Sequence, residues 1–208
     1  MPGTIFWDVD TQYDFMHADG KLYVPDAEQV IPNLKRLTDH AHRAGIRIVA
    51  SADDHVAGHR ELSEAPDFRE TFPPHCMHGT PGQAKIPETA LKAPTVIEPD
   101  ATGVSVPVGD ILFHKHWFDV FTNPNVEPVV HQLDPDRIYV YGVAMDVCNR
   151  YAIEGLLGRR PNTKIFAVTD ATKPIDATRV QGLLDDWRRR GVTTVTTDQV
   201  ITQTSRLA

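Results

Sequence analysis

Short apolar segments alternate with helical segments along most of this chain, and this alternation constrains the fold more than any other feature of the sequence. Six segments have the composition of buried strands, at residues 4–9, 46–51, 111–114, 137–141, 164–169 and 192–196. Strands that are separated by helices pair in parallel, through right-handed crossovers that cover the faces of the sheet. The sequence therefore predicts the α/β class, as a three-layer α/β/α sandwich.

Two predicted helices have recognisable ends. Residues 26–44 carry apolar side chains at helical spacing. Asp26 is expected to cap the start of this helix and Gly45 to end it. Residues 177–190 form the second helix. Residues 54–110 are the least regular part of the chain and contain many prolines, and a loop this long inside a compact domain is usually functional. We expect it to wall the site.

Composition limits the possible partners and the compartment. The 208 residues suffice for a single domain, 1–208, with a full hydrophobic core. A net charge of −7, without a long basic run, disfavours nucleic acid and anionic membrane as partners. No apolar run approaches the roughly 20 residues that span a bilayer, and no signal peptide opens the chain. We therefore expect a cytoplasmic protein, in which a disulfide between Cys76 and Cys148 is disfavoured.

Polar side chains follow four of the predicted strands, at the point where each strand ends. They are Asp10, Asp53, Lys115 and Cys148. Because the carboxyl ends of parallel strands share one edge of a sheet, ligands of such sheets bind at that edge. We expect these four side chains to meet there.

Cys148 lies in the first turn of a predicted helix, directly after a strand and Gly142. Free N–H groups at a helix N-terminus favour ionisation of a thiol, and the thiolate is the nucleophilic form. This position indicates that Cys148 is a nucleophile and not merely a small buried hydrophobic residue. Cys76 lacks a comparable position and is interpreted as structural. A nucleophilic thiol needs a base and a stabilising cation, and Asp10 and Lys115 can supply both. Taken alone, that aspartate and lysine would indicate only a salt bridge.

The run Asp53-Asp54-His55 suggests a metal site. Residues two apart in an extended chain face the same side, so Asp53 and His55 would present a carboxylate oxygen and an imidazole nitrogen together. His75, which follows two prolines, is a third candidate ligand. One carboxylate and two imidazoles leave positions open for water or substrate. The remaining nearby histidines are expected to be solvated or to lie behind the ligands: His59, His78, His114 and His116.

Four segments together resemble the isochorismatase-like cysteine hydrolases and, among them, the nicotinamidases. Residues 10–15 resemble the family's Asp-x-Gln-x-Asp-Phe opening. Residues 53–55 and 72–82 resemble the nicotinamidase metal motif and its Trp-Pro-x-His-Cys-x-x-Gly-Thr loop. Lys115 precedes an aromatic-rich loop, and residues 142–148 resemble the signature Gly-Val-Ala-Thr-Asp-x-Cys. The order and spacing agree along most of the chain.

This resemblance implies a parallel sheet of six strands and a catalytic triad of Asp10, Lys115 and Cys148. It also implies a non-proline cis peptide bond between Val143 and Ala144, with the Ala144 and Cys148 N–H groups forming an oxyanion hole. In the implied reaction Asp10 takes the thiol proton, and the thiolate attacks the carbonyl carbon of a small amide. Water then cleaves the thioester.

The resemblance further implies a divalent metal, most often zinc, with iron or manganese as alternatives. The implied metal ligands are Asp53, His55 and His75. Aromatic faces suit a flat substrate, and the pocket residues expected on this basis are Phe15, Phe72 and Val143. Trp117 is assigned equally to the pocket and to core packing. Relatives are often dimers or tetramers, so a homo-oligomer is expected.

The chain departs from the nicotinamidase pattern around the pocket. Asp54 replaces an aromatic residue, Phe72 replaces a tryptophan, and residues 113–118 differ from the usual loop. Some relatives carry a further histidine six residues after the metal-binding His, whereas here His59 lies four residues after His55. Three interpretations remain: a metal-dependent nicotinamidase-type amidase, a cysteine hydrolase for another small substrate (an acyclic amide, ureido acid or isochorismate-like ether), and a non-catalytic binding or redox protein. Metal content separates the first two, and thiol alkylation tests the third.

Overall fold

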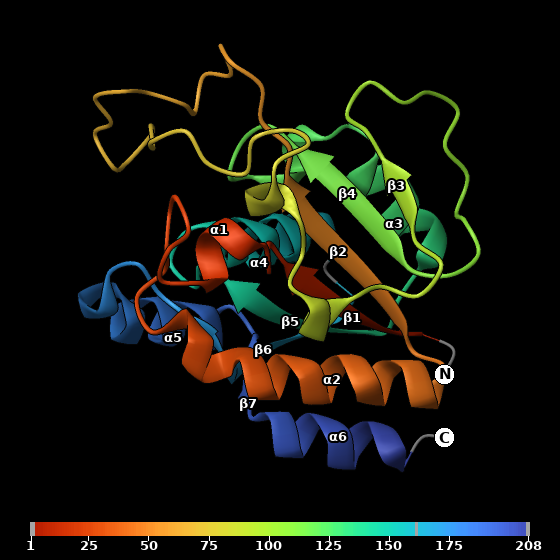
Figure 1. The fold of residues 1–208 in the computed structure, drawn as a ribbon. Coiled ribbons are helices and arrows are strands. Elements are labelled where there is room, and N and C mark those ends of the chain that lie inside the picture. Colours follow the sequence, from red (N-terminus) through yellow and green to blue (C-terminus); the bar gives the residue numbers. More distant parts are fainter. Residues whose placement is uncertain (1–2, 161, 207–208) are drawn as a thin grey trace.

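The computed structural model describes residues 3–160 and 162–206. Its strands form one parallel sheet in the order β3-β4-β2-β1-β5-β6-β7 (Figure 1). The strands are β1 (Thr4–Val9), β2 (Arg47–Asp53), β3 (Thr95–Ile97), β4 (Ile111–Lys115), β5 (Arg137–Val143), β6 (Lys164–Lys173) and β7 (Thr193–Val195). The predicted α/β fold with a parallel sheet is confirmed, whereas the prediction of six strands was wrong, because the sheet has seven.

The strand that the sequence analysis missed is β3. It has three residues, pairs with β4 at the edge of the sheet and buries only Ile97. A strand this short that buries one side chain has no measurable periodicity, and prolines on both sides made the segment read as a loop.

Helices cover both faces of the sheet (Figure 1). They are α1 (Tyr13–Met16), α2 (Ile31–Ala44), α3 (Val126–Leu133), α4 (Cys148–Arg159), α5 (Val180–Arg189) and α6 (Thr197–Ser205). On one face α2 and α6 lie side by side and share a buried cluster with Phe6 of β1. The next residue, Trp7, points to the opposite face and packs with side chains of α3, α4 and α5. Alternation along β1 thus builds two cores, as a three-layer sandwich requires.

The predicted helix at residues 26–44 begins later than expected. Ala27–Val30 forms a 3-10 turn, and Asp26 has a positive φ of 61° and caps nothing. The α-helix starts at Ile31 with Pro32 in its first turn, where no N–H donor is needed. Gly45 ends the helix as predicted, in the left-handed conformation with φ 64°.

The long segment between β2 and β3 lies beyond the carboxyl edge of the sheet (Figure 1). It folds back on itself, since the Phe72 N–H donates to the carbonyl of Glu61 at 2.8 Å. A second bridge pairs His55 with Met77. These contacts bring distant parts of the segment over the ends of β2 and β4. No helix in the described ranges is long and apolar enough to cross a membrane.

Candidate active site

The four polar residues predicted at strand ends do converge. Asp10 directly follows β1, Asp53 and Lys115 are the last residues of β2 and β4, and Cys148 begins α4 just beyond β5. In the sheet β4, β2, β1 and β5 are consecutive neighbours. Their carboxyl ends therefore form one edge, and all four side chains are buried there.

Lys115 is the centre of this cluster. Its Nζ lies 2.9 Å from Asp10 Oδ2 and 3.9 Å from Cys148 Sγ, and it also forms a close ion pair with Asp53. Ser51 Oγ donates a hydrogen bond of 2.7 Å to the other oxygen of Asp10. The structure thus places a carboxylate, an ammonium group and a thiol in one buried cluster. The arrangement can move a proton from sulfur to carboxylate beside a fixed positive charge.

Burial and neighbouring charges together set the ionisation of these groups. It raises the pKa of Asp10, although Lys115 opposes the shift. Burial also raises the pKa of the Cys148 thiol well above its usual range, more than Lys115 lowers it. For Lys115 burial acts to lower the pKa, but Asp10 and Asp53 overcome it and the pKa is raised well above its usual range. The prediction that the helix N-terminus would make this thiol ionise easily is not supported, because desolvation outweighs the helix N–H groups.

The turn between β5 and α4 positions Cys148. Gly142 has φ 106°, and a Cβ on it would lie 2.1 Å from the carbonyl oxygen of Val9 on β1. Only glycine allows this close approach. Asn149 Nδ2 ties the turn together by donating to the carbonyl of Gly142 at 3.1 Å and to Thr172 Oγ1 at 2.9 Å. The predicted cis peptide bond between Val143 and Ala144 is present.

A cluster suited to a metal ion lies next to this cavity. Its members are Asp53, His55, Glu61 and His75, all buried, and their potential ligand atoms lie within 4.8 Å of one another. His75 Nε2 is 3.5 Å from Asp53 Oδ2 and 3.6 Å from Glu61 Oε1. Zinc–ligand distances of about 2.0–2.2 Å imply ligand atoms roughly 3.3–3.6 Å apart in a tetrahedral site, so this spacing fits a metal.

The unsatisfied atoms of the cluster support the same conclusion. Among the described residues, four of its buried side-chain atoms have no hydrogen-bond partner: Asp53 Oδ2, His55 Nε2, Glu61 Oε2 and His75 Nε2. Buried polar atoms are normally hydrogen-bonded, whereas these four unpaired atoms all belong to the same cluster. His75 Nδ1 lies 2.7 Å from the Pro73 carbonyl, which can only accept, so Nε2 carries the free lone pair. The chemistry of these donors fits a divalent cation.

Charge in the cluster is set by burial and by Lys115. Burial would raise the pKa of Asp53, but Lys115 and the two histidines hold it below its usual range. Burial lowers the pKa of His55 to about 4, so this imidazole is neutral and able to bind a metal at neutral pH. Burial raises the pKa of Glu61 to about 7, and the neighbouring Asp53 adds to the shift.

Glu61 was missed by the sequence analysis. It lies six residues after His55, at the spacing where some relatives carry a histidine, and a carboxylate there can serve as a ligand instead. The spacing was therefore an available signal. It pointed to a histidine and not to a carboxylate, and a lone glutamate in an irregular segment usually faces solvent.

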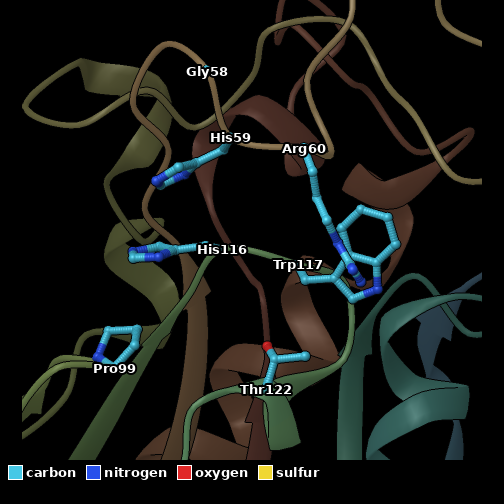
Figure 2. A pocket seen from close by; sticks show the side chains of 7 residues that line it. All are labelled: Gly58, His59, Arg60, Pro99, His116, Trp117 and Thr122. Atoms are coloured by element: carbon cyan, nitrogen blue, oxygen red, sulfur yellow. The ribbon is translucent and has the colours of Figure 1, made fainter.

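His59 and His116 lie outside the ligand cluster, as expected. His59 Nδ1 is 3.3 Å from Nδ1 of His55, and the rings of His59 and His116 have centroids 4.2 Å apart. Figure 2 shows the two imidazoles side by side in an outer pocket. Trp117 lines this outer pocket too, with Arg60 3.6 Å above its ring (Figure 2). Of the two places considered for Trp117, the structure supports core packing, because this side chain packs against the core cluster and does not line the cavity that contains Cys148.

Asp54 points away from the ligand cluster, since neighbouring residues of an extended chain face opposite sides. It accepts hydrogen bonds from His78 at 2.8 Å and from Gln83 at 2.7 Å. His114 lies 3.5 Å from it and 2.8 Å from Glu98. The polar groups of these residues therefore bond to one another, on the side of the chain that faces away from the ligand cluster.

The cavity that contains Cys148 is narrow and largely apolar. Its walls include the predicted residues Phe15, Phe72, Val143 and Ala144. Asp53 and Glu61, which belong to the ligand cluster, form its polar end. Phe118 also lines it and was not predicted, because the aromatic run 117–118 gave no indication of which ring faces inward.

Known proteins resemble this chain over most of its length. A nicotinamidase/pyrazinamidase of Mycobacterium tuberculosis is 26% identical over 196 residues, which cover 88% of this chain and 94% of that protein. The pyrazinamidase of Pyrococcus horikoshii, solved in complex with zinc, has a TM-score of 0.73 at 23% identity, covering 94% of this chain and 99% of its own. An N-carbamoylsarcosine amidase of Thermoplasma acidophilum has a TM-score of 0.73 at 23% identity, covering 94% and 96%.

The family model of the isochorismatase domain matches residues 5–199. The match contains β1 except its first residue, all of β2 to β7 and every residue of the two clusters described above. Because it spans almost the whole chain, this protein belongs to the isochorismatase family of hydrolases.

Proposed function

We propose that this protein hydrolyses the C–N bond of a small amide and releases ammonia through a thioester on Cys148. The observation that carries the proposal is the position of the Lys115 ammonium group, 2.9 Å from the Asp10 carboxylate and 3.9 Å from the Cys148 sulfur. A structural salt bridge would not need a buried thiol beside it. The similarity to a nicotinamidase/pyrazinamidase supports the same reaction class.

The proposed reaction begins with a neutral thiol. Asp10, whose raised pKa suits a base, takes the proton from Cys148 while Lys115 remains charged and stabilises the new thiolate. The sulfur attacks the amide carbonyl carbon, and the oxyanion accepts hydrogen bonds from the N–H groups of Ala144 and Cys148. Each such donor stabilises a comparable transition state by about 3–4 kcal/mol.

The C–N bond then breaks as Asp10 returns its proton to the departing nitrogen, which leaves as ammonia. Water attacks the thioester, with Asp10 now accepting a proton from that water. The S–C bond breaks, Asp10 returns this proton to the departing sulfur, and the carboxylic acid leaves the restored thiol of Cys148. One water is consumed for each amide cleaved, so the atoms balance.

Asp53, His55, Glu61 and His75 would hold a divalent metal, which we propose to be zinc because two imidazoles and two carboxylates suit it. The zinc in the Pyrococcus relative supports this choice, and iron and manganese suit the same donors. When bound, the metal supplies a Lewis acid that can hold a ring nitrogen or a water at the polar end of the cavity. Among the described residues, Asp53 alone belongs to both clusters, since it also pairs with Lys115.

Nicotinamide and pyrazinamide are the first substrates to test, because Phe15 and Phe72 offer apolar faces for a flat ring. Acyclic amides are the second class. The likeness to an N-carbamoylsarcosine amidase shows only the shared fold, but the narrow cavity favours small substrates. Self-association and a cytoplasmic location stay predictions of the sequence analysis.

The decisive experiment is an ammonia-release screen of the metal-loaded protein. Nicotinamide, pyrazinamide and small acyclic amides are compared, and the metal content of the same sample is measured. We expect turnover of at least one class together with roughly one metal per chain. Absence of ammonia release from every amide would refute the proposal and favour a binding or redox protein. Turnover without any metal would favour a metal-free hydrolase of the same fold.

A further inference from the structure

A second, larger cavity adjoins the one that contains Cys148. Its volume is about 570 Å³. The two cavities share four wall residues: Phe72, Phe118, Val147 and Ile175. Ile175 is 39% exposed, so this shared wall reaches solvent. We call this outer cavity the antechamber, and the part of a substrate too large for the inner cavity would extend into it.

Arg150 lines this antechamber, two residues after Cys148 on α4. Its guanidinium group lies 4.7 Å over the ring of Tyr151, which packs on Phe118 with centroids 4.8 Å apart. Since Phe118 belongs to the shared wall, the stack fixes the guanidinium beside the passage. Arginine remains charged at any physiological pH.

Arg150 forms no close ion pair within the described residues, although Asp146 and Glu154 line a neighbouring pocket together with it. Arg159 and Arg160 pair with carboxylates, and Arg179 in the same antechamber pairs with Asp146 at 3.7 Å. Within residues 3–160 and 162–206, no such pair includes Arg150. Its Nε is buried without a hydrogen-bond partner. A buried donor left unpaired is costly, so this position suits an anionic ligand.

The acidic groups of the antechamber are already engaged. Asp146 accepts the N–H groups of Ile175 and Asp176 at 2.8 Å and 3.0 Å. Asp176 accepts the N–H and hydroxyl of Thr178 at 2.9 Å and 2.6 Å. The remaining charged wall residues, Arg69 and Glu70, are exposed on the long loop and balance each other in charge.

The inner cavity has the opposite character. Its lining is largely apolar, and its polar residues Asp53 and Glu61 belong to the ligand cluster. A carboxylate would lose its hydration there with no guanidinium to receive it, whereas an uncharged amide loses less. An amide that also carries an acid group therefore has one favourable orientation, with its carbonyl at Cys148 and its acid toward Arg150. This difference between the two cavities determines the substrate class.

We infer that the substrate is an amide that bears a carboxylate a short spacer away from the scissile carbonyl, and that Arg150 binds this carboxylate. The inference rests on the proposed amidase function. Arg150 touches the substrate but not the reacting bond, so it determines specificity and leaves the chemistry to the cluster around Lys115.

The test compares matched amides. Succinamate, glutaramate and adipamate are each measured against the neutral amide in which a methyl group replaces the carboxylate. For at least one spacer, we expect kcat/KM of the acid to exceed that of its neutral partner by about tenfold or more, since a charged hydrogen bond is gained. Arg150→Gln should reduce this ratio about tenfold, mainly through KM, and Arg150→Lys should restore part of it.

Arg159→Gln is the matched control, because Arg159 lies on the same helix and pairs with Glu127 outside the antechamber. It should leave the ratio unchanged. Equal rates for acids and neutral partners in the unsubstituted protein, or an equal loss for both in Arg150→Gln, would overturn the inference while leaving amide hydrolysis intact.

A binding measurement separates this inference from the proposed reaction. Calorimetry with Cys148→Ala measures the affinity for each acid amide and its neutral partner without turnover. If no amide is hydrolysed but the acids bind preferentially and lose that preference in Arg150→Gln, the reaction is wrong and the carboxylate subsite stands. If neither amide class binds preferentially, the subsite is refuted whatever the reaction.

Discussion

At the scale of single residues, burial and helix position act on the Cys148 thiol in opposite directions. Charges near a helix terminus gain roughly 0.3–1 kcal/mol, whereas full burial can shift a pKa by up to about 3–5 units. Burial therefore prevails and raises the pKa of this thiol. A neutral resting thiol would react slowly with alkylating reagents even in an active enzyme. Slow alkylation is thus a poor test of catalysis, and substrate turnover is the better one.

Replacing Cys148 by alanine should abolish ammonia release, because Cys148 is the thiol that contacts Lys115 and lines the inner cavity, whereas Cys76 does not line it. Metal content and Tm should stay close to those of the unsubstituted protein, since Cys148 is not among the cluster residues suited to the metal. Colorimetric ammonia assays and metal analysis of the same preparation check both points. Substantial remaining turnover would remove Cys148 from the mechanism.

Replacing Glu61 by glutamine should weaken metal binding by about tenfold or more, because one charged donor of the cluster is lost with little change in shape. Chelator competition measures the affinity. His78→Gln is the control, because His78 is exposed and contacts Asp54 behind the site. An unchanged affinity for Glu61→Gln, or an equal loss for His78→Gln, would show that Glu61 is not a ligand.

At the scale of secondary-structure elements, the passage from β5 to α4 depends on a backbone contact. Gly142 approaches β1 so closely that any side chain would meet the carbonyl of Val9. The sequence analysis identified Gly142 as the end of the strand and Cys148 as part of the following helix. The extension of β5 to Val143 was decided by pairing with β6, whose register shifts between Val140 and Gly142.

Replacing Gly142 by alanine should lower the free energy of unfolding by about 2 kcal/mol or more, because the positive φ is strained for alanine and the new Cβ meets the Val9 carbonyl. Gly158→Ala is the matched control within α4, since a Cβ there meets nothing within 4 Å. It should stabilise the protein by up to about 1 kcal/mol. Denaturant titrations of both variants measure the change in the free energy of unfolding. An unchanged free energy for Gly142→Ala would contradict the close approach of Gly142 to Val9.

The long loop over the carboxyl edge is held by one aspartate of α1. Asp14 Oδ2 accepts the Cys76 N–H at 2.7 Å, and Oδ1 accepts the Lys21 N–H at 3.0 Å. Gly82 packs so closely that a Cβ would lie 2.2 Å from Asp14 Oδ2. This contact places His75, the neighbour of Cys76, against the end of β2. Asp14, near the N-terminus, therefore helps to assemble the ligand cluster.

At the scale of the whole molecule, the two clusters are linked through the ion pair of Lys115 and Asp53. Asp53 offers one oxygen to the ligand cluster and the other to Lys115, which also contacts Asp10 and Cys148. A change of charge at the ligand cluster therefore reaches the candidate triad through Lys115 and also directly, because Asp53 raises the pKa of both Asp10 and Cys148.

Metal binding should depend on pH. The pKa of Glu61 is raised from 4.5 to about 7, so below pH 7 a metal must displace its proton, and affinity should fall about tenfold per pH unit for each proton displaced. The free energy of unfolding of the metal-free protein changes in the matching direction. Because the pKa of Glu61 is raised in the folded state, this free energy falls as pH rises from 4.5 to 7. The Tm gain from zinc should therefore be larger at pH 8 than at pH 6 in calorimetric scans. A gain independent of pH would contradict this assignment, and Glu61→Gln should reduce the dependence.

The sequence by itself determined the features that depend on local chemistry. Alternating strands and helices predicted the parallel α/β sandwich, and polar residues at strand ends predicted the meeting of Asp10, Lys115 and Cys148. These succeeded because the end of a parallel strand has a fixed place in any such sheet. A local signal was also overlooked: Thr196 and Gln199 form a capping box that starts α6.

Only the tertiary structure decided the features that depend on long-range contacts. Glu61 joins the ligand cluster because the irregular loop pairs with itself between residues 62 and 72, and β3 exists because β4 offers it an edge. The ionisation of Cys148 depends on how deeply the surrounding walls bury it, and the unpaired state of Arg150 depends on which carboxylates other elements bring near. The spacing of residues along the chain predicts neither the desolvation of Cys148 nor the pairing of Arg150, because both are set by residues far away in the sequence.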